Sequence, residues 1–241
     1  EAAHSDGPGI GSQVSLDGGF GFAANQVPAG TGGANAWRVE GQADLKDLGW
    51  AERGHVGGYA QQREACFSAP GQVAANETKQ MGVAATLPLG EGSELRAKAD
   101  RKNEVNGYNT EVGELQASTR LDEHWSVAAA VRSDRKSSYA LNTSPLLPTS
   151  GVLQGERTDA SVQLDYSQGA DWGVYGFGQK TLGRTGTRLD NDRLGVGGRY
   201  RVTDKLALRG EASGGDGGAA GKAGVDYQYD DRSNVYLTYA R

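Results

Sequence analysis

The stretch ASVQLDY at residues 160–166 decides the fold of this chain. Its even positions carry apolar side chains and its odd positions carry polar ones. The stretch AGVDYQY at residues 223–229 repeats this alternation. Successive side chains of a β-strand point to opposite faces of a sheet, so each stretch is predicted to be a strand with one apolar and one polar face.

The same alternation restarts about a dozen times from Trp37 onward, and each restart is predicted to be a strand. The predicted strands are 38–46, 54–67, 78–88, 94–103, 110–121, 125–136, 158–167, 171–181, 192–202, 206–213, 221–229 and 235–241. The chain contains no apolar run of 18 residues or more, which excludes a transmembrane helix but leaves membrane-spanning strands open.

The connections between these strands are predicted to alternate between short and long. Short ones are expected at 89–93, 122–124, 167–170, 203–205 and 230–234, and long ones at 68–77, 102–109, 136–157, 182–191 and 213–220. Short turns at one end and long loops at the other are typical of outer-membrane barrels, whereas Greek-key sandwiches mix their connection lengths. The sequence therefore predicts an all-β, up-and-down antiparallel transmembrane β-barrel of about 12 strands over residues 37–241. Residues 1–36 are Gly-rich and are expected to form a leader or a segment inside the lumen, with a short strand near 14–24.

The composition fits a barrel with a wet lumen, because only 37% of the 241 residues are hydrophobic and 38 are glycine. Disorder is the alternative explanation of low hydrophobicity, but the ordered alternation argues against it. A net charge of −5 with interspersed signs provides no basic footprint for nucleic acid. The single cysteine, Cys66, and three scattered histidines favour no disulfide, metal or other cofactor.

Charged side chains must take the inner face of such a barrel, because a charge at the lipid midplane costs about 2–4 kcal/mol. The candidate lumen and selectivity residues are Arg96, Lys98, Arg132, Asp165, Arg199, Arg201, Arg209, Glu211 and Asp226. Either they form a charged constriction that selects solutes, or they pair across strands and stabilise the wall. If a segment of the wall selects anions, we expect it to be the basic strip around Arg199, Arg201 and Arg209.

Trp125, Tyr166 and Trp172 lie beside predicted short turns, and Trp50 lies in the connection between the first two predicted strands. Aromatic side chains gather at the two interfaces of a membrane, so this placement indicates an interfacial belt.

Catalytic patterns are weak. The adjacent residues His4, Ser5 and Asp6 cannot form a triad, because triads are assembled from positions far apart in the sequence. A serine and a histidine on the barrel wall, as in outer-membrane phospholipases, are the alternative. We expect no enzyme activity.

The stretches 194–211 and 224–239 resemble strand–turn–strand units of bacterial outer-membrane β-barrels, most closely those in the barrel regions of large Gram-negative surface proteins. The resemblance implies a place in the outer membrane, contact with its lipid and lipopolysaccharide, and assembly by the barrel-assembly machinery. One departure is the ending Tyr239-Ala240-Arg241, where such barrels end on Phe or Trp. Either the last strand is atypical or the chain is part of a larger protein.

Three functions follow from this interpretation. The first is a pore for small polar solutes or a polypeptide, supported by the charged face. The second is a non-conducting anchor that presents surface loops or a fused domain, supported by the mixed signs of the lumen charges. The third is a soluble β-domain adhesin, supported by the weakly apolar outer face. The sequence names neither a solute nor a protein partner.

Overall fold

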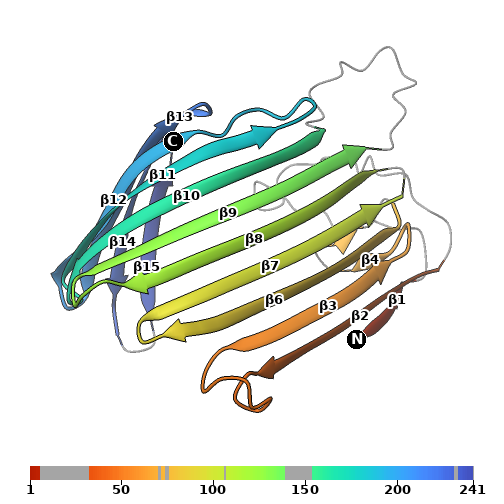
Figure 1. The fold of residues 1–241 in the computed structure, drawn as a ribbon, viewed down its shortest axis with the longest axis horizontal. Helices are drawn as coiled ribbons and strands as arrows, with labels where there is room; N and C mark the ends of the chain where they lie inside the picture. The colour runs from red at the N-terminus through yellow and green to blue at the C-terminus, as the bar shows by residue number, and fades with distance from the viewer. Residues whose placement is uncertain are drawn as a thin grey trace. The chain divides into compact units, whose positions relative to one another are not determined.

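The computed structural model describes residues 1–5, 33–69, 72–73, 76–105, 107–138, 154–230 and 233–240. Thirteen of its strands form one sheet in which each strand pairs with the next one along the chain (Figure 1). All the pairings whose registers are resolved are antiparallel. The prediction of an all-β, up-and-down antiparallel fold is confirmed.

The strands are long, as the alternating stretches predict. In chain order the sheet contains β1 (Ala2–Ser5), β2 (Ala34–Asp44), β3 (His55–Arg63), β6 (Thr78–Gly90), β7 (Ser93–Glu104), β8 (Tyr108–Arg120), β9 (Trp125–Ser138), β10 (Gly155–Gln168), β11 (Trp172–Arg184), β12 (Arg193–Thr203), β13 (Leu206–Gly215), β14 (Gly218–Gln228) and β15 (Asn234–Ala240). A separate two-stranded sheet consists of β4 (Ser68–Ala69) and β5 (Gln72–Val73).

Each of the twelve predicted strands has a counterpart in the structure, and β1 is a further strand of the sheet that was not predicted. Ala2–Ser5 pairs with residues 34–37 of β2, so part of the 1–36 region belongs to the sheet. A four-residue strand is too short to show an alternation. The strand expected near 14–24 lies outside the described residues, and the assignment of 1–36 as a leader or lumen segment stays a prediction.

Two of the long connections were predicted wrongly. The β7–β8 connection is only residues 105–107, and the β13–β14 connection is only residues 216–217. In the second case the ladder continues to the pair Gly215 and Gly218, and Gly218 has a φ of +96°, which glycine adopts without a steric penalty. The Asp-Gly dipeptide at 216–217 is a common hairpin turn, and reading the surrounding small residues as a loop overlooked it.

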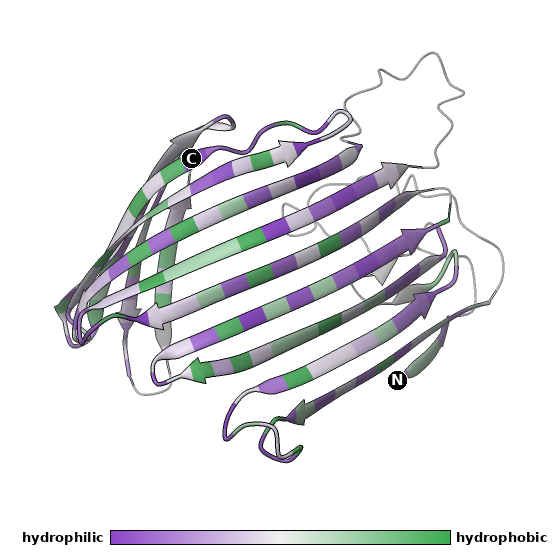
Figure 2. Cartoon of the chain, viewed as in Figure 1, coloured by the Kyte–Doolittle hydropathy of each residue, from purple (hydrophilic) through white to green (hydrophobic). Residues whose placement is uncertain are grey.

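The strands carry one apolar and one charged face. On the apolar face Val162, Val196 and Leu237 are 54%, 64% and 72% exposed. Hydrophilic and hydrophobic residues alternate along the strands in Figure 2. The faces assigned from the sequence agree with the registers, since Val162 and Leu164 lie opposite Gly178 and Gly176 while Asp165 lies opposite Tyr175.

Little apolar surface is buried. Among the described residues only Ala34, Leu45 and Phe67 form a buried hydrophobic core. Two packed sheets would bury the residues between them, so the large sheet is not half of a sandwich. No helix in the described part of the chain is long and apolar enough to cross a membrane.

Contacts divide the chain into two compact units, and each is described below by itself. The first unit contains Glu1–Ala85, Lys98–Val112 and Arg135–Gln154. The second contains Thr86–Ala97, Gly113–Asp134 and Gly155–Arg241.

Candidate functional site

The charged face of the first unit is organised around Tyr59 on β3. Its hydroxyl donates a hydrogen bond to Asp100 on β7, and Gln80 on β6 donates one to the Asp100 carboxylate at 3.1 Å. The Tyr59 ring crosses Gly82, where an added Cβ would lie 2.7 Å from ring carbon Cε1. Glycine at position 82 is therefore what allows a tyrosine to reach an acid two strands away.

A second contact also holds the Tyr59 ring. The guanidinium of Arg38 lies 4.6 Å from the centroid of the Tyr59 ring, a cation–π distance. Arg38 also donates to Gln61 at 3.0 Å and forms an ion pair of 2.7 Å with Glu40. The ring is thus enclosed by polar contacts that fix its position.

Beside this network lies a hollow of about 460 Å³. Lys98 lines it together with His55, Gln42 and Glu40. No ion pair of Lys98 is found among the described residues. The hollow therefore combines Lys98, which has no direct ion pair there, with the carboxylates of Glu40 and Asp100.

The second unit repeats the tyrosine arrangement. Tyr175 on β11 crosses Gly197 on β12, and its hydroxyl donates a hydrogen bond of 2.6 Å to Glu211 on β13. Glu211 also lies 3.9 Å from Lys222 and 4.0 Å from Arg193. The carboxylate at 211, a predicted lumen residue, is part of a cross-strand network.

The basic strip is only partly neutralised. Arg209 lies 3.4 Å from Asp226 and donates to Thr238 at 3.2 Å. Arg199 is directly opposite Arg209 in register, and like charges in that position repel one another.

Two arginines of this strip form no direct ion pair with a described residue. Within the described ranges, Arg199 and Arg201 have no ion pair. Arg201 lines a hollow of about 490 Å³ with Lys205 and the acids Asp204, Asp226 and Asp230. Positive charge without an ion pair therefore remains at Arg199, opposite Arg209, whereas Arg201 lies among acids.

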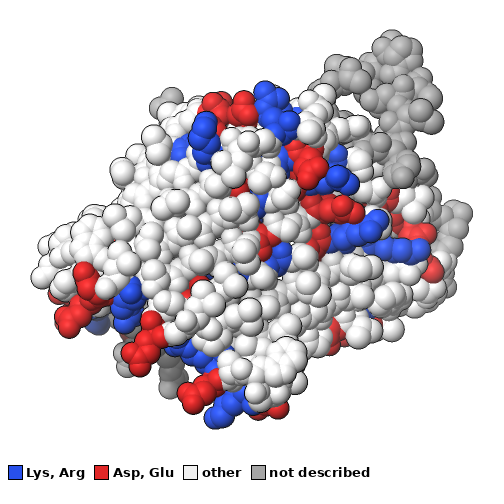
Figure 3. All heavy atoms as spheres, in the orientation of Figure 1, with Lys and Arg blue, Asp and Glu red and all other residues white. Residues whose placement is uncertain are grey.

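The other predicted lumen residues find partners on their own face. Arg96 pairs with Glu94 at 2.6 Å, and Arg132 pairs with Glu114 at 3.0 Å. Asp165 accepts a hydrogen bond of 2.8 Å from Gln163. Figure 3 shows acidic and basic side chains next to one another on the visible surface. For most of the predicted set, mutual pairing is what the geometry favours.

The sequence analysis missed the most deeply buried charges. Arg188, in the β11–β12 connection, is 2% exposed and forms an ion pair with Asp134 of β9. Asp159 is also buried and accepts hydrogen bonds from Arg157 at 2.9 Å and from the Thr181 hydroxyl at 2.8 Å. Asp134 lies two positions after Arg132 on β9, so the alternation of side chains could have identified it as a charged-face residue. The alternation gives no information about Arg188, which lies in a connection.

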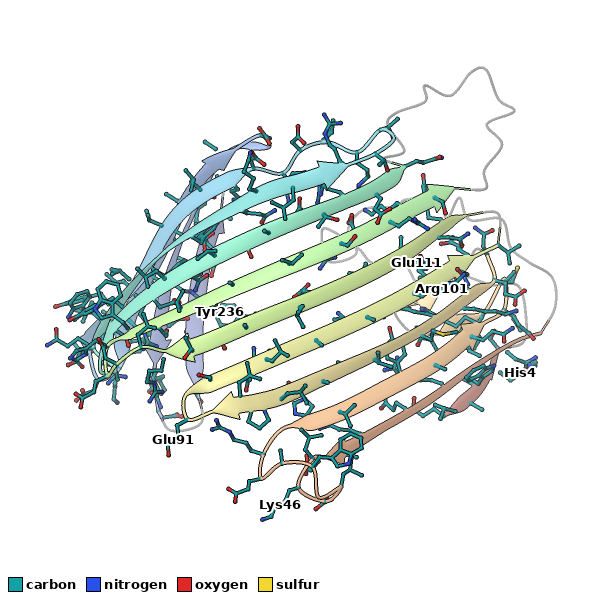
Figure 4. The ribbon with its side chains drawn as sticks, in the orientation of Figure 1. His4, Lys46, Glu91, Arg101, Glu111 and Tyr236 are labelled. Atoms are coloured by element: carbon teal, nitrogen blue, oxygen red, sulfur yellow. The ribbon has the colours of Figure 1, made fainter. Side chains whose placement is uncertain are left out.

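Charges on the apolar face occur toward the β7–β8 connection. Arg101 on β7 and Glu111 on β8 form an ion pair of 3.4 Å and lie together in Figure 4. They follow the apolar positions Leu95, Ala97 and Ala99 of β7 on the same face. The apolar part of this face therefore ends before the strands do.

An aromatic cluster lies at the start of β9, the end of β10 and the start of β11. The ring centroid of Tyr166 lies 4.9 Å from that of Trp125 and 5.1 Å from that of Trp172. The imidazole of His124 lies 5.6 Å from the same tyrosine ring. The three larger residues occupy the apolar face, as the alternation predicts.

The turn before β9 is capped by Asp122. Its carboxylate accepts the backbone N–H of His124 at 2.7 Å and that of Trp125 at 2.8 Å. These two hydrogen bonds hold the pKa of Asp122 below its ordinary value, and the bond from His124 has the larger effect.

No family model matches the chain, and no curated protein matches it. Two solved structures are similar to it. One is titled "KdgM porin in complex with disordered oligogalacturonate", with 12% identity and a TM-score of 0.42 over 81% of this chain and 98% of the other. The other is titled "KdgM porin", with 10% identity and a TM-score of 0.43 over 82% of this chain and 94% of the other.

Proposed function

We propose that this chain is a bacterial outer-membrane β-barrel whose charged face lines a water-filled pathway for small polar solutes. The observation that carries the proposal is the exposed apolar face of a single long meander, with the charges on the opposite face of its strands. Large exposed apolar surfaces mark contact with protein or lipid. Val196 and Leu237, both among the most exposed apolar residues, are suited to lipid contact.

The ends of the strands fit the same assignment. Arg101 and Glu111 place charge beyond the apolar part of their strands, and the cluster of Trp125, Tyr166 and Trp172 lies near the turns at the other end. Charged groups beyond an apolar band and aromatic groups at its rim are the usual arrangement at membrane interfaces. We infer that lipid and lipopolysaccharide contact this face, and that the barrel-assembly machinery inserts the chain.

A sheet in hydrocarbon cannot leave a strand edge unpaired, because each unsatisfied backbone group costs several kcal/mol. We infer that the sheet closes on itself or is completed by further strands. Barrels of about 12 strands enclose more space than the eight-stranded ones whose side chains fill the interior. The resulting space supports passage of solutes.

The charge distribution favours anionic solutes. Arg199 and Arg201 form no ion pair among the described residues, although acids line the same hollow as Arg201, whereas Glu211 and Asp226 are held by cations at 3.4–4.0 Å. Rings or strips of one sign repel ions of the same sign at short range. A passing carboxylate or phosphate would find its counter-charge at this strip.

A non-conducting anchor is the second candidate. The ion pairs Arg132–Glu114 and Arg209–Asp226 show a face that neutralises much of its own charge. Such cross-strand pairs would also stabilise a barrel wall through which no solute passes.

Reconstitution of the whole chain in planar bilayers separates the candidates. A pore gives discrete single-channel steps whose size depends on the salt. A bilayer that takes up the protein yet stays electrically silent would favour the anchor. A protein that stays in solution as a folded monomer without detergent would contradict both membrane functions.

A further inference from the structure

The connection between β11 and β12, residues 185–192, folds back over the charged face of its own unit. Arg188 reaches Asp134 of β9, with 2.7 Å between its Nη2 and the carboxylate Oδ2. The backbone N–H of Asn191 donates to the Thr181 hydroxyl of β11 at 2.8 Å. Both acceptors lie on the charged face of their strands, so these two contacts attach the segment to that face.

The attachment through Arg188 is buried. The arginine is 2% exposed and Asp134 is 7% exposed. Both hydrogen bonds from Arg188 to Asp134 come from its Nη2, and its buried Nε finds no partner among the described residues. The guanidinium is therefore incompletely satisfied, and its position depends on the charge of Asp134.

The two ends of the segment are held by the adjoining strands, since Thr185 accepts the backbone N–H of Glu156 at 3.0 Å and Asp192 accepts that of Thr181 at 2.8 Å and pairs with Lys180. Two arginines make further contacts with its middle part. Arg157 donates to the carbonyl oxygen of Leu189 at 3.3 Å, and Arg184 pairs with Asp190 at 2.7 Å. The Arg184–Asp190 pair is nearly half exposed on both sides, and exposed ion pairs contribute little because water competes for the charges. Loss of the buried pair should free the middle of the segment around Arg188, whereas loss of the exposed one should not.

We propose that residues 185–192 form a constriction of the pore, held over the charged face by the Arg188–Asp134 pair as a latch. This inference rests on the proposed pore function. A segment that extended away from the sheet would satisfy its polar groups with water. Residues 185–192 instead place the Arg188 guanidinium and the backbone N–H of Asn191 over the face that lines the pathway, and they narrow it there.

The test is Asp134→Asn in the whole chain, which keeps the shape of the side chain and removes the charge that compensates Arg188. We expect a larger single-channel conductance. We also expect tryptic cleavage after Arg188 to become at least about tenfold faster, because removing one partner of a buried pair strongly destabilises it. Asp190→Asn is the matched control, since it makes the same chemical change in the same segment at an exposed pair. Its effects should be much smaller.

A second variant keeps the test informative if Asp134→Asn does not fold. Arg188→Met removes the charge, keeps an apolar stem of similar length and leaves no unpaired guanidinium. Cleavage after Arg184 then reports release of the segment. Heat-dependent mobility on a gel shows that each variant has folded.

The outcomes separate the latch from the pore. If the unmodified protein conducts but neither variant changes conductance or cleavage, the latch is wrong and the pore stands. If cleavage accelerates at unchanged conductance, the segment is attached but does not narrow the pathway, which overturns the constriction. If the unmodified protein is silent, the pore and the constriction fail together.

Discussion

The hydroxyl of Tyr175 donates a hydrogen bond of 2.6 Å to Glu211, although the two residues lie on strands separated by β12. The bond is possible because Gly197 lies beneath the ring. Tyr59, Gly82 and Asp100 repeat the arrangement in the other unit. Glycine in a strand is usually a weakness, and here the aromatic ring of a neighbouring strand covers it.

Gly197→Ala should therefore destabilise the sheet. The new Cβ would meet the Tyr175 ring, which must shift and lose its bond to Glu211, and overpacking of this kind costs about 1–3 kcal/mol. Heat-induced unfolding in detergent, followed by circular dichroism, measures the loss. Gly214→Ala is the control, because no atom lies within 4 Å of its added Cβ. Equal unfolding temperatures for the two variants would contradict this account.

Neutralising the basic strip should change ion selectivity. We expect replacement of Arg199, Arg201 and Arg209 by glutamine to shift the reversal potential in a salt gradient toward cation preference. Arg101→Gln, on the apolar face of β7, should leave the reversal potential in place. A triple variant that keeps the original reversal potential would show that the strip does not line the pathway.

Cysteine labelling should distinguish the two faces. With Cys66 replaced by serine, cysteine at position 163 should react with a water-soluble maleimide in proteoliposomes, because Gln163 shares the charged face with Asp165. Cysteine at positions 196 and 237 should be protected, because lipid covers the apolar face. Rapid labelling at 196 and 237 together with protection at 163 would mean that the apolar side chains face water.

The Asp122 cap should stabilise the protein only where its carboxylate is charged. Its pKa is lowered in the folded state, so the stabilisation is fully present above the unfolded pKa of about 4 and is lost as the pH falls through the folded value. We therefore expect Asp122→Ala to lower the unfolding temperature at pH 7, and the difference from the unmodified protein to shrink below about pH 4. A difference that is constant with pH would assign the effect to the turn backbone alone.

Much of the sheet could be predicted from the sequence because the period of two is a local signal. The stretch at 160–166 shows it plainly, and β10 with its register to β11 agrees with the faces assigned to Val162 and Asp165. β1 could not be found in this way, because Ala2–Ser5 is stabilised by pairing with β2 and has no alternation of its own.

The site was less predictable because its key contacts connect distant positions. Alternation places Arg132 and Asp134 on one face, but it cannot show that Arg188 would fold back from a connection 54 positions further along the chain. Nor can it show that Arg209 finds Asp226 while Arg199 finds no acid. Local periodicity assigns faces, whereas the compensation of charge depends on the register between strands.

The exposed position of Arg199 beside Arg209 makes any effect of their charge depend on ionic strength. The field of an exposed charge decays over about 8 Å at 0.15 M salt, about 3 Å at 1 M and about 30 Å at 0.01 M. A partly neutralised strip of guanidinium groups would therefore attract anions from some distance in dilute media and only on contact in concentrated ones. A cell that moved between fresh water and brine would change the preference of such a pore without altering the protein.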